Sequence, residues 1–169
     1  MKAPRGYIVS NIVYISKTWW CNLEFTYKER SVIGTMLISL IVNIYYFSKA
    51  WEIYDAGTPT VAEILPLMGA VVVLLIILEI TYEAVIATRP GYDIVDERDR
   101  TYEAKGERVS GFILAAGIYI CLGHIIWNDV FEQLDSTTIF IAANGLILTL
   151  VIAEFTKGLI QLSAYRRGI

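Results

Sequence analysis

Four long apolar stretches, separated by short polar segments, make up most of the chain. No charged residue lies between Arg30 and Lys49. About 20 helical residues, at about 1.5 Å each, suffice to cross a hydrocarbon core about 30 Å thick. Backbone groups in lipid must be hydrogen-bonded within their own segment, so each crossing stretch is expected to be a helix. The pattern predicts spans over about residues 31–51, 64–88, 109–127 and 137–162.

These spans predict an all-α fold, an integral membrane four-helix bundle built from two hairpins. Residues 28–95 are expected to form the first transmembrane hairpin and residues 96–169 the second. Residues 1–27 precede them, and apolar side chains recur there at helical spacing, at Ile8, Ile12, Ile15 and Trp19. That spacing predicts an amphipathic helix in the membrane interface, and the alternative is a helix that docks on a partner.

The second half of the chain resembles the first. With a shift of 75 residues, Leu75–Thr81 aligns with Leu150–Thr156. Upstream, Thr26–Arg30 resembles Thr101–Arg108, which holds three more residues. The match indicates a duplicated hairpin whose copies share one orientation and are related by an axis along the membrane normal. Such symmetry is consistent with a transport path and also with packing alone.

The composition agrees with a membrane protein, because 56% of the residues are hydrophobic and the mean hydropathy is +0.53. Soluble domains are rarely so apolar. The formal net charge of −3 is too small and too evenly spread to indicate a nucleic-acid partner. The cysteines, Cys21 and Cys121, form no C-x-x-C pair, so a redox role has no support. No nucleophile motif, phosphate-binding loop or zinc signature is present, so no enzyme activity, catalytic residue, metal or cofactor is expected.

Basic residues are unevenly distributed between the two sides of the predicted spans. They gather before the first span, between the second and third, and at the end of the chain, whereas the other two loops hold only Lys49. Lysine and arginine near span ends are retained in the cytoplasm. The distribution therefore predicts a protein of the cell membrane, surrounded by the lipid bilayer, with both termini on the cytoplasmic side.

Glu79 and Glu154 are the sharpest candidates for chemistry. The shift of 75 residues aligns them, and an ionisable group at the bilayer centre costs about 2.5 kcal/mol or more. Counted along their helices, both lie low, near the cytoplasmic boundary. That position favours ion pairs that fix the helix register, with Lys28, Arg30 or Arg108 at the starts of neighbouring spans. The alternative is a pair of proton-binding or cation-binding carboxylates.

The loop before the third span is the most distinctive segment. It begins with acids and arginines side by side, at Asp96, Glu97, Arg98, Asp99 and Arg100. The spacing of Asp96 and Arg100 suits a helical ion pair, and the basic neighbours neutralise the acids. A solvated helical face, available to a protein partner, is therefore favoured over a metal site. Further along, Gly106 is expected to interrupt this helix.

Other polar and small residues within the spans are expected to serve packing. His124, the only histidine, is placed at the membrane interface rather than in a metal site, which needs several converging ligands. Asn43 and Asn144 are expected to form interhelical hydrogen bonds. Close approach of helices is predicted at the small residues Gly69, Gly111, Ala115, Gly117 and Gly145.

The segment Asp96–Gly111, DERDRTYEAKGERVSG, resembles a family of small predicted four-helix membrane proteins from bacteria and archaea. In that family a D-E-R-D segment and a following E-x-K stretch lead into the third span. The match covers the second hairpin and the end of the second span, and hardly touches the N-terminal 27 residues. The family has no established activity, so the resemblance implies a topology and no catalytic residues.

Taken together, these features predict a non-enzymatic multi-pass membrane protein. It is expected to act by self-association, as a homo-oligomer, or as an accessory partner of a membrane or cytoplasmic protein through the charged loop. The alternative is a small proton-coupled or cation-coupled transporter or channel that uses Glu79 and Glu154.

Overall fold

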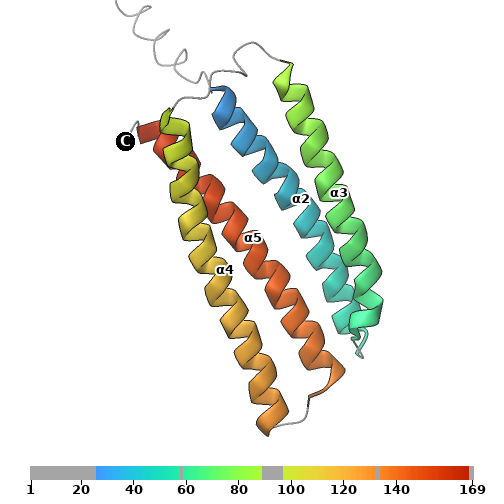
Figure 1. Cartoon of the computed structure of the whole chain (residues 1–169). Helices are drawn as coiled ribbons and strands as arrows, with labels where there is room; N and C mark the ends of the chain where they lie inside the picture. The colour runs from blue at the N-terminus through green and yellow to red at the C-terminus, as the bar shows by residue number, and fades with distance from the viewer. Residues whose placement is uncertain (1–25, 58, 89–96, 132–133, 168–169) are drawn as a thin grey trace, which may run out of the picture.

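The computed structural model describes residues 26–57, 59–88, 97–131 and 134–167, and these ranges contain four helices. The helices are α2, Tyr27–Asp55; α3, Val61–Ala87; α4, Glu97–Phe131; and α5, Ser136–Arg167 (Figure 1). Each is long and apolar enough to cross a membrane. The prediction of an all-helical fold with four such segments is thereby confirmed for the described residues. The expected interfacial helix over residues 1–27 lies outside the described residues except for Thr26 and Tyr27, which begin α2.

α4 begins earlier than the apolar pattern predicted, at Glu97 rather than near Val109. The expected interruption at Gly106 is wrong, because the helix runs through this residue. Gly106 is buried against α5, and an added Cβ would lie 3.1 Å from the carbonyl oxygen of Lys157. The glycine therefore permits a close helix contact instead of ending the helix.

Two helix starts have well-formed caps. The Thr26 hydroxyl accepts the Glu29 N–H at 3.2 Å, and the Glu29 carboxylate accepts the Thr26 N–H at 2.9 Å, which together form a capping box at α2. At α5 the Asp135 carboxylate accepts the Thr138 N–H at 2.7 Å. Hydrogen bonds from Thr138 hold the pKa of Asp135 below its usual range.

The helices form two antiparallel hairpins, α2–α3 and α4–α5, that meet mainly through α2 and α5 (Figure 1). α4 packs along α5, and across the molecule the order is α4, α5, α2, α3. We call the end at which α2 and α4 begin the charged end, and the opposite end, where each hairpin turns, the hairpin end. In this arrangement α2 and α5 form the centre of the molecule.

Close approach between helices depends on glycines at specific positions. Between α4 and α5, a Cβ at Gly117 would lie 2.0 Å from Thr149, and one at Gly145 would lie 3.0 Å from the sulfur of Cys121. The predicted packing role of Gly117 and Gly145 is thus confirmed. A Cβ added at Gly69 or Gly111 would meet no atom within 4 Å, so these two glycines do not mediate the helix contact expected of them.

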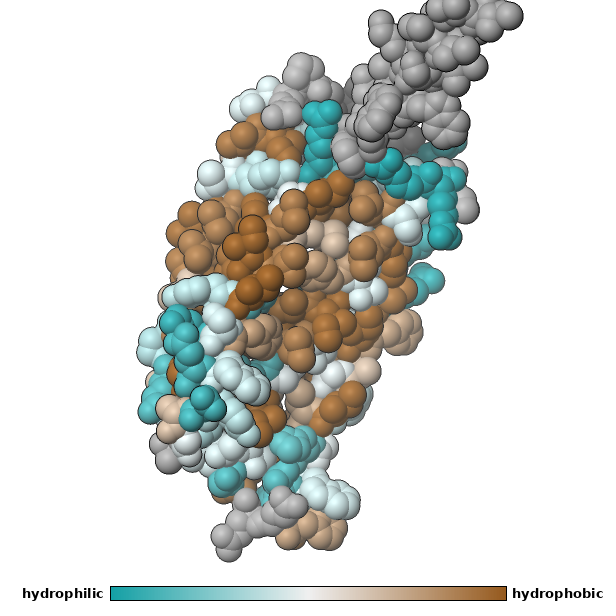
Figure 2. Space-filling model, turned by 180° about the vertical axis from the view of Figure 1, so that it is seen from behind, coloured by the Kyte–Doolittle hydropathy of each residue, from teal (hydrophilic) through white to brown (hydrophobic). Residues whose placement is uncertain are grey.

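The buried core lies toward the hairpin end, while most of the outer surface is apolar. Tyr46 and Ile64 are fully buried in this core, together with Val42, Ala50, Val71 and Phe140. Figure 2 shows a broad hydrophobic zone across the middle of one face, with hydrophilic residues toward its ends. An apolar outer surface of this extent suits contact with lipid.

Candidate functional site

A cavity among the described residues lies between the two hairpins and has a volume of about 920 Å³. It is lined by side chains of α2, α3 and α5, and α4 contributes Glu103 and Glu107. From Lys28 to Tyr46, its lining follows α2 for about 27 Å at 1.5 Å per residue. The cavity therefore extends from the charged end to the buried core.

A polar stripe of α2 faces this cavity. Its members recur every three or four residues, at Lys28, Ser31, Thr35, Ser39, Asn43 and Tyr46. That spacing places them on one face of the helix. Several satisfy their hydrogen-bonding groups within the helix, as when Asn43 donates to the carbonyl of Ser39 at 2.8 Å. Polar residues are otherwise scarce in a segment that crosses lipid, and they usually face a cavity or a partner helix.

The two asparagines that were expected to form interhelical hydrogen bonds have different partners. Asn144 of α5 accepts a hydrogen bond from the Tyr46 hydroxyl of α2 at 3.0 Å, so its interhelical role is confirmed. Asn43 bonds to Ser39 of its own helix instead, and the interhelical bond expected of it is not formed among the described residues. Tyr46 is 1% exposed and ends the polar stripe at the buried core.

Glu79 of α3 and Glu154 of α5 both line the cavity. Their carboxylates are close enough for mutual electrostatic repulsion. Among the described residues neither of them forms an ion pair. The expected contacts with Arg30 and Arg108 are absent, since both arginines are exposed and lie outside the cavity lining. The structure thus brings the two glutamates together and leaves the two arginines apart from them.

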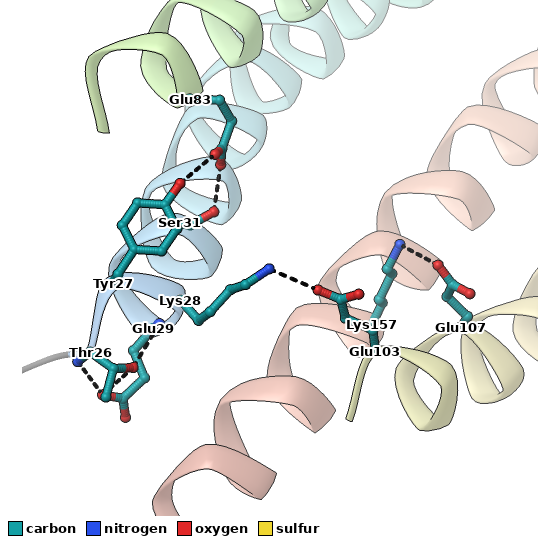
Figure 3. A network of polar contacts seen from close by, with 9 residues as sticks. All are labelled: Thr26, Tyr27, Lys28, Glu29, Ser31, Glu83, Glu103, Glu107 and Lys157. Atoms are coloured by element: carbon teal, nitrogen blue, oxygen red, sulfur yellow. Dashed lines mark hydrogen bonds and ion pairs between the residues drawn. The ribbon is translucent and has the colours of Figure 1, made fainter. Parts of the chain in front are cut away.

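Ion pairs form instead nearer the charged end, between residues that the sequence did not single out as a network (Figure 3). Lys28 of α2 binds Glu103 of α4 at 3.2 Å, and Lys157 of α5 binds Glu107 of α4 at 3.5 Å. These lysines are partly buried in the cavity lining. Because they bind carboxylates of α4, they form no ion pair with Glu79 or Glu154. Lys28 was an expected partner of the two glutamates, and this pairing corrects that expectation.

The first turns of α2 connect it to the other three helices. Tyr27 and Ser31 both donate to Glu83 of α3, Tyr27 at 3.4 Å. Glu29, buried in the capping box, accepts from Arg166 of α5 at 2.9 Å. With the Lys28 pair to α4, this segment holds all four helices at the charged end (Figure 3).

The charged segment expected to contact partners begins α4. Asp96 lies outside the described residues, and Glu97, Arg98 and Arg100 are exposed. Asp99 is half-buried and interacts with Tyr165 of α5. Burial, and then the Asp99 carboxylate, raise the pKa of Tyr165. The exposed members of the segment thus lie on a solvent-facing side of α4, whereas Asp99 binds back to the bundle.

His124 lies apart from the cavity, toward the hairpin end of α4. Its Nδ1 is 3.4 Å from the amide nitrogen of Asn128, and its Nε2 is buried without a hydrogen-bond partner in the described part of the chain. In that same part, no three His, Cys, Asp or Glu side chains are grouped as metal binding requires.

Some cavity residues could have been found in the sequence. The stripe Ser31, Thr35, Ser39 and Asn43 is visible as a helical period within an apolar span. Gln161 is harder to find, because a single amide near the end of a span has many explanations. It lines the cavity, is 7% exposed and forms no hydrogen bond with the described residues.

No protein-family model, curated protein or solved structure matches the chain. The resemblance of Asp96–Gly111 to a family of small four-helix membrane proteins stays a prediction.

Proposed function

We propose that the protein is a small proton-coupled or cation-coupled membrane transporter in which Glu79 and Glu154 bind the transported or coupling cation. The observation that supports this most is that both carboxylates line one cavity and neither has a cationic partner among the described residues. Ion pairs that merely fixed the helix register would have given each glutamate a lysine or arginine. Two unpaired carboxylates in a partly apolar cavity instead favour binding of a positive charge between them.

The polar stripe of α2 supports a path for that charge. It extends from Lys28 at the charged end to the buried Tyr46, which is hydrogen-bonded to Asn144. The distribution of basic residues favours a cytoplasmic position for the charged end. In this orientation the cavity opens toward the cytoplasm and is closed on the outer side by the core around Tyr46 and Ile64. In the proposed transport cycle this arrangement is the inward-facing state.

The internal repeat supports the same proposal. Glu79 and Glu154 are equivalent under the shift of 75 residues, and so are Lys28 and Glu103, which form an ion pair. A repeat that supplies one glutamate from each copy to a shared cavity is consistent with transport.

The proposal is tested by measuring proton flux into liposomes that contain the purified full chain and a pH-sensitive dye. We expect Glu79→Gln and Glu154→Gln each to abolish flux while the protein remains folded. Glu63→Gln is the matched control, because Glu63 is an exposed glutamate of α3 outside the cavity lining, and this variant should keep the wild-type flux. Unaltered flux in both cavity variants would refute the proposal.

A second candidate function is association with a protein partner through the charged segment that begins α4. The observation in its favour is that Glu97, Arg98 and Arg100 are exposed on a helix that starts well before the predicted span. Purification in mild detergent from the native membrane, followed by identification of co-purifying proteins, tests it. Recovery of the chain alone, as a monomer or homo-oligomer, would count against a distinct partner.

A further inference from the structure

The cavity has the size of a binding site for an organic molecule. Its volume of about 920 Å³ falls in the range of about 300–1,000 Å³ that is usual for sites of drug-sized ligands. A proton, or an inorganic ion with its few coordinating oxygens, fills only a small part of such a space. The dimensions therefore favour a ligand larger than a proton or an inorganic ion.

The walls around the two glutamates are apolar. Leu75 and Ile76 precede Glu79 by about one turn on α3, and Val151 and Phe155 flank Glu154 on α5. Side chains of this kind bind hydrocarbon or aromatic groups by excluding water.

The net charge of the cavity selects the sign of the ligand. Five glutamates line it, and only two lysines do, so three carboxylates have no cationic partner in the lining. The two lysines bind Glu103 and Glu107 at the charged end. Glu83 accepts hydrogen bonds from the hydroxyl groups of Tyr27 and Ser31, which carry no charge. The excess negative charge thus lies at Glu79, Glu83 and Glu154, where it attracts cations and repels phosphate headgroups.

Two further observations identify an organic cation rather than a metal ion. No three carboxylate, histidine or cysteine groups converge as metal ligands among the described residues. In addition, the Gln161 amide lines the cavity, is 7% exposed, and has no hydrogen-bond partner in the described part of the chain. The Gln161 amide is therefore available at the cavity wall to hydrogen-bond with a polar group of a ligand near its charge.

From these features we infer that the cavity binds an organic cation with an apolar body, its charge between Glu79 and Glu154 and its body against the walls of α3 and α5. This inference rests on the proposed function, because it uses the same two carboxylates and specifies what they carry. A lipid acyl chain entering from the bilayer is the competing occupant. It would pack against the apolar walls but would form no favourable polar interaction with the glutamates or with Gln161.

The probe is tetraphenylphosphonium, a permanent organic cation that has no proton to exchange. Its binding to the purified full chain in detergent is measured by equilibrium dialysis, and proton release on binding is followed in weakly buffered solution. We expect saturable binding that is accompanied by proton release and weakens as the pH falls, because protons compete for the carboxylates. Glu79→Gln combined with Glu154→Gln should weaken binding at least about tenfold, as expected when a charge partner is removed. Glu63→Gln should bind like the wild type.

Controls separate charge from shape and from folding. Triphenylphosphine oxide, which is neutral and similarly bulky, should bind at least about tenfold more weakly than the cation. Leu75→Trp, which fills the cavity and keeps both glutamates, should weaken tetraphenylphosphonium binding and leave proton binding in place. Circular dichroism and size-exclusion profiles identify any variant that fails to fold.

Three results would overturn the inference: equal binding of the neutral probe, unchanged cation binding in the double variant, or no cation binding at all. If the cation fails to bind while Glu79 and Glu154 still support proton flux, the substrate class is wrong and the proposed transport function stands. If the flux is also independent of both glutamates, the two proposals fail together. Phospholipid that co-purifies and is not displaced by the cation would assign the cavity to lipid.

Discussion

The hydrogen bond between Tyr46 and Asn144 offers a direct test of how the two hairpins are held together. The Tyr46 hydroxyl donates to the Asn144 side chain at 3.0 Å, and Tyr46 is 1% exposed. Tyr46→Phe removes the donor and leaves the ring in place. The Asn144 oxygen then loses its partner beside the buried ring of Tyr46.

The size of the effect follows from these contacts. A net protein hydrogen bond is worth about 0.5–1.5 kcal/mol, and a buried acceptor left unsatisfied costs about 1–3 kcal/mol. Interhelical bonds measured in a membrane protein average about 0.6 kcal/mol and reach about 1.7 kcal/mol. We therefore expect Tyr46→Phe to lower the free energy of unfolding by about 1–2 kcal/mol. Tyr45→Phe, on the exposed neighbouring tyrosine, should change it by less than about 0.5 kcal/mol.

The assay is reversible unfolding in mixed micelles with increasing sodium dodecyl sulfate, followed by tryptophan fluorescence. A double-mutant cycle of Tyr46→Phe with Asn144→Ala isolates the pair, because each single variant removes the same bond. We expect a coupling energy of about 0.5–1.5 kcal/mol. A coupling within about 0.3 kcal/mol of zero, which is the usual error of additivity, would refute this account of the hairpin contact.

Three other predictions use the same unfolding assay. Gly117→Val should destabilise the protein by about 1–3 kcal/mol through overpacking, since a Cβ there would lie 2.0 Å from a side chain of α5, whereas Gly123→Ala, which faces open space, should be neutral or stabilising. The Lys28–Glu103 pair is partly exposed, so a double-mutant cycle with Lys28→Gln and Glu103→Gln should give less than about 1 kcal/mol at low salt and fall further in about 1 M salt. The pKa of Asp135 is lowered by folding, so its stabilising effect is present above its unfolded value of about 3.9 and is lost as the pH falls through the folded value. Asp135→Ala should abolish this part of the acid sensitivity, and an unchanged pH profile below about pH 4 would contradict that assignment.

The four helices could be predicted from the sequence, because an uninterrupted apolar stretch is a local property of the chain. The continuity of α4 could not, since the charged turns of Glu97–Arg108, although expected to be helical, join the apolar stretch without a break. Gly106 misled for the same reason, because its use in a helix contact depends on Lys157 of a distant segment. Local sequence therefore predicts the apolar part of each helix well, and it predicts the helical turns beyond the apolar part poorly.

Sequence reasoning could identify the two glutamates of the candidate site but not the residues that surround them. The unusual position of Glu79 and Glu154 can be recognised in each span separately, because a carboxylate in an apolar stretch is rare. Their partners depend on which helix faces which, and depth alone wrongly suggested Arg30 and Arg108. The arginines lie at a suitable height but on exposed faces, whereas the cavity side is occupied by Lys28 and Lys157.

The connections made by the first turns of α2 have a consequence for how the protein is produced. This segment is synthesised early, yet Glu103 and Arg166, which bind Lys28 and Glu29, emerge from the ribosome only with the second hairpin. A nascent chain that has inserted α2 and α3 still lacks the wall of the cavity formed by α5, and its Glu29 lacks a counter-charge. Premature termination before α5 would thus leave an incomplete product that membrane quality control can recognise, and a finished cavity would exist only in chains translated through α5.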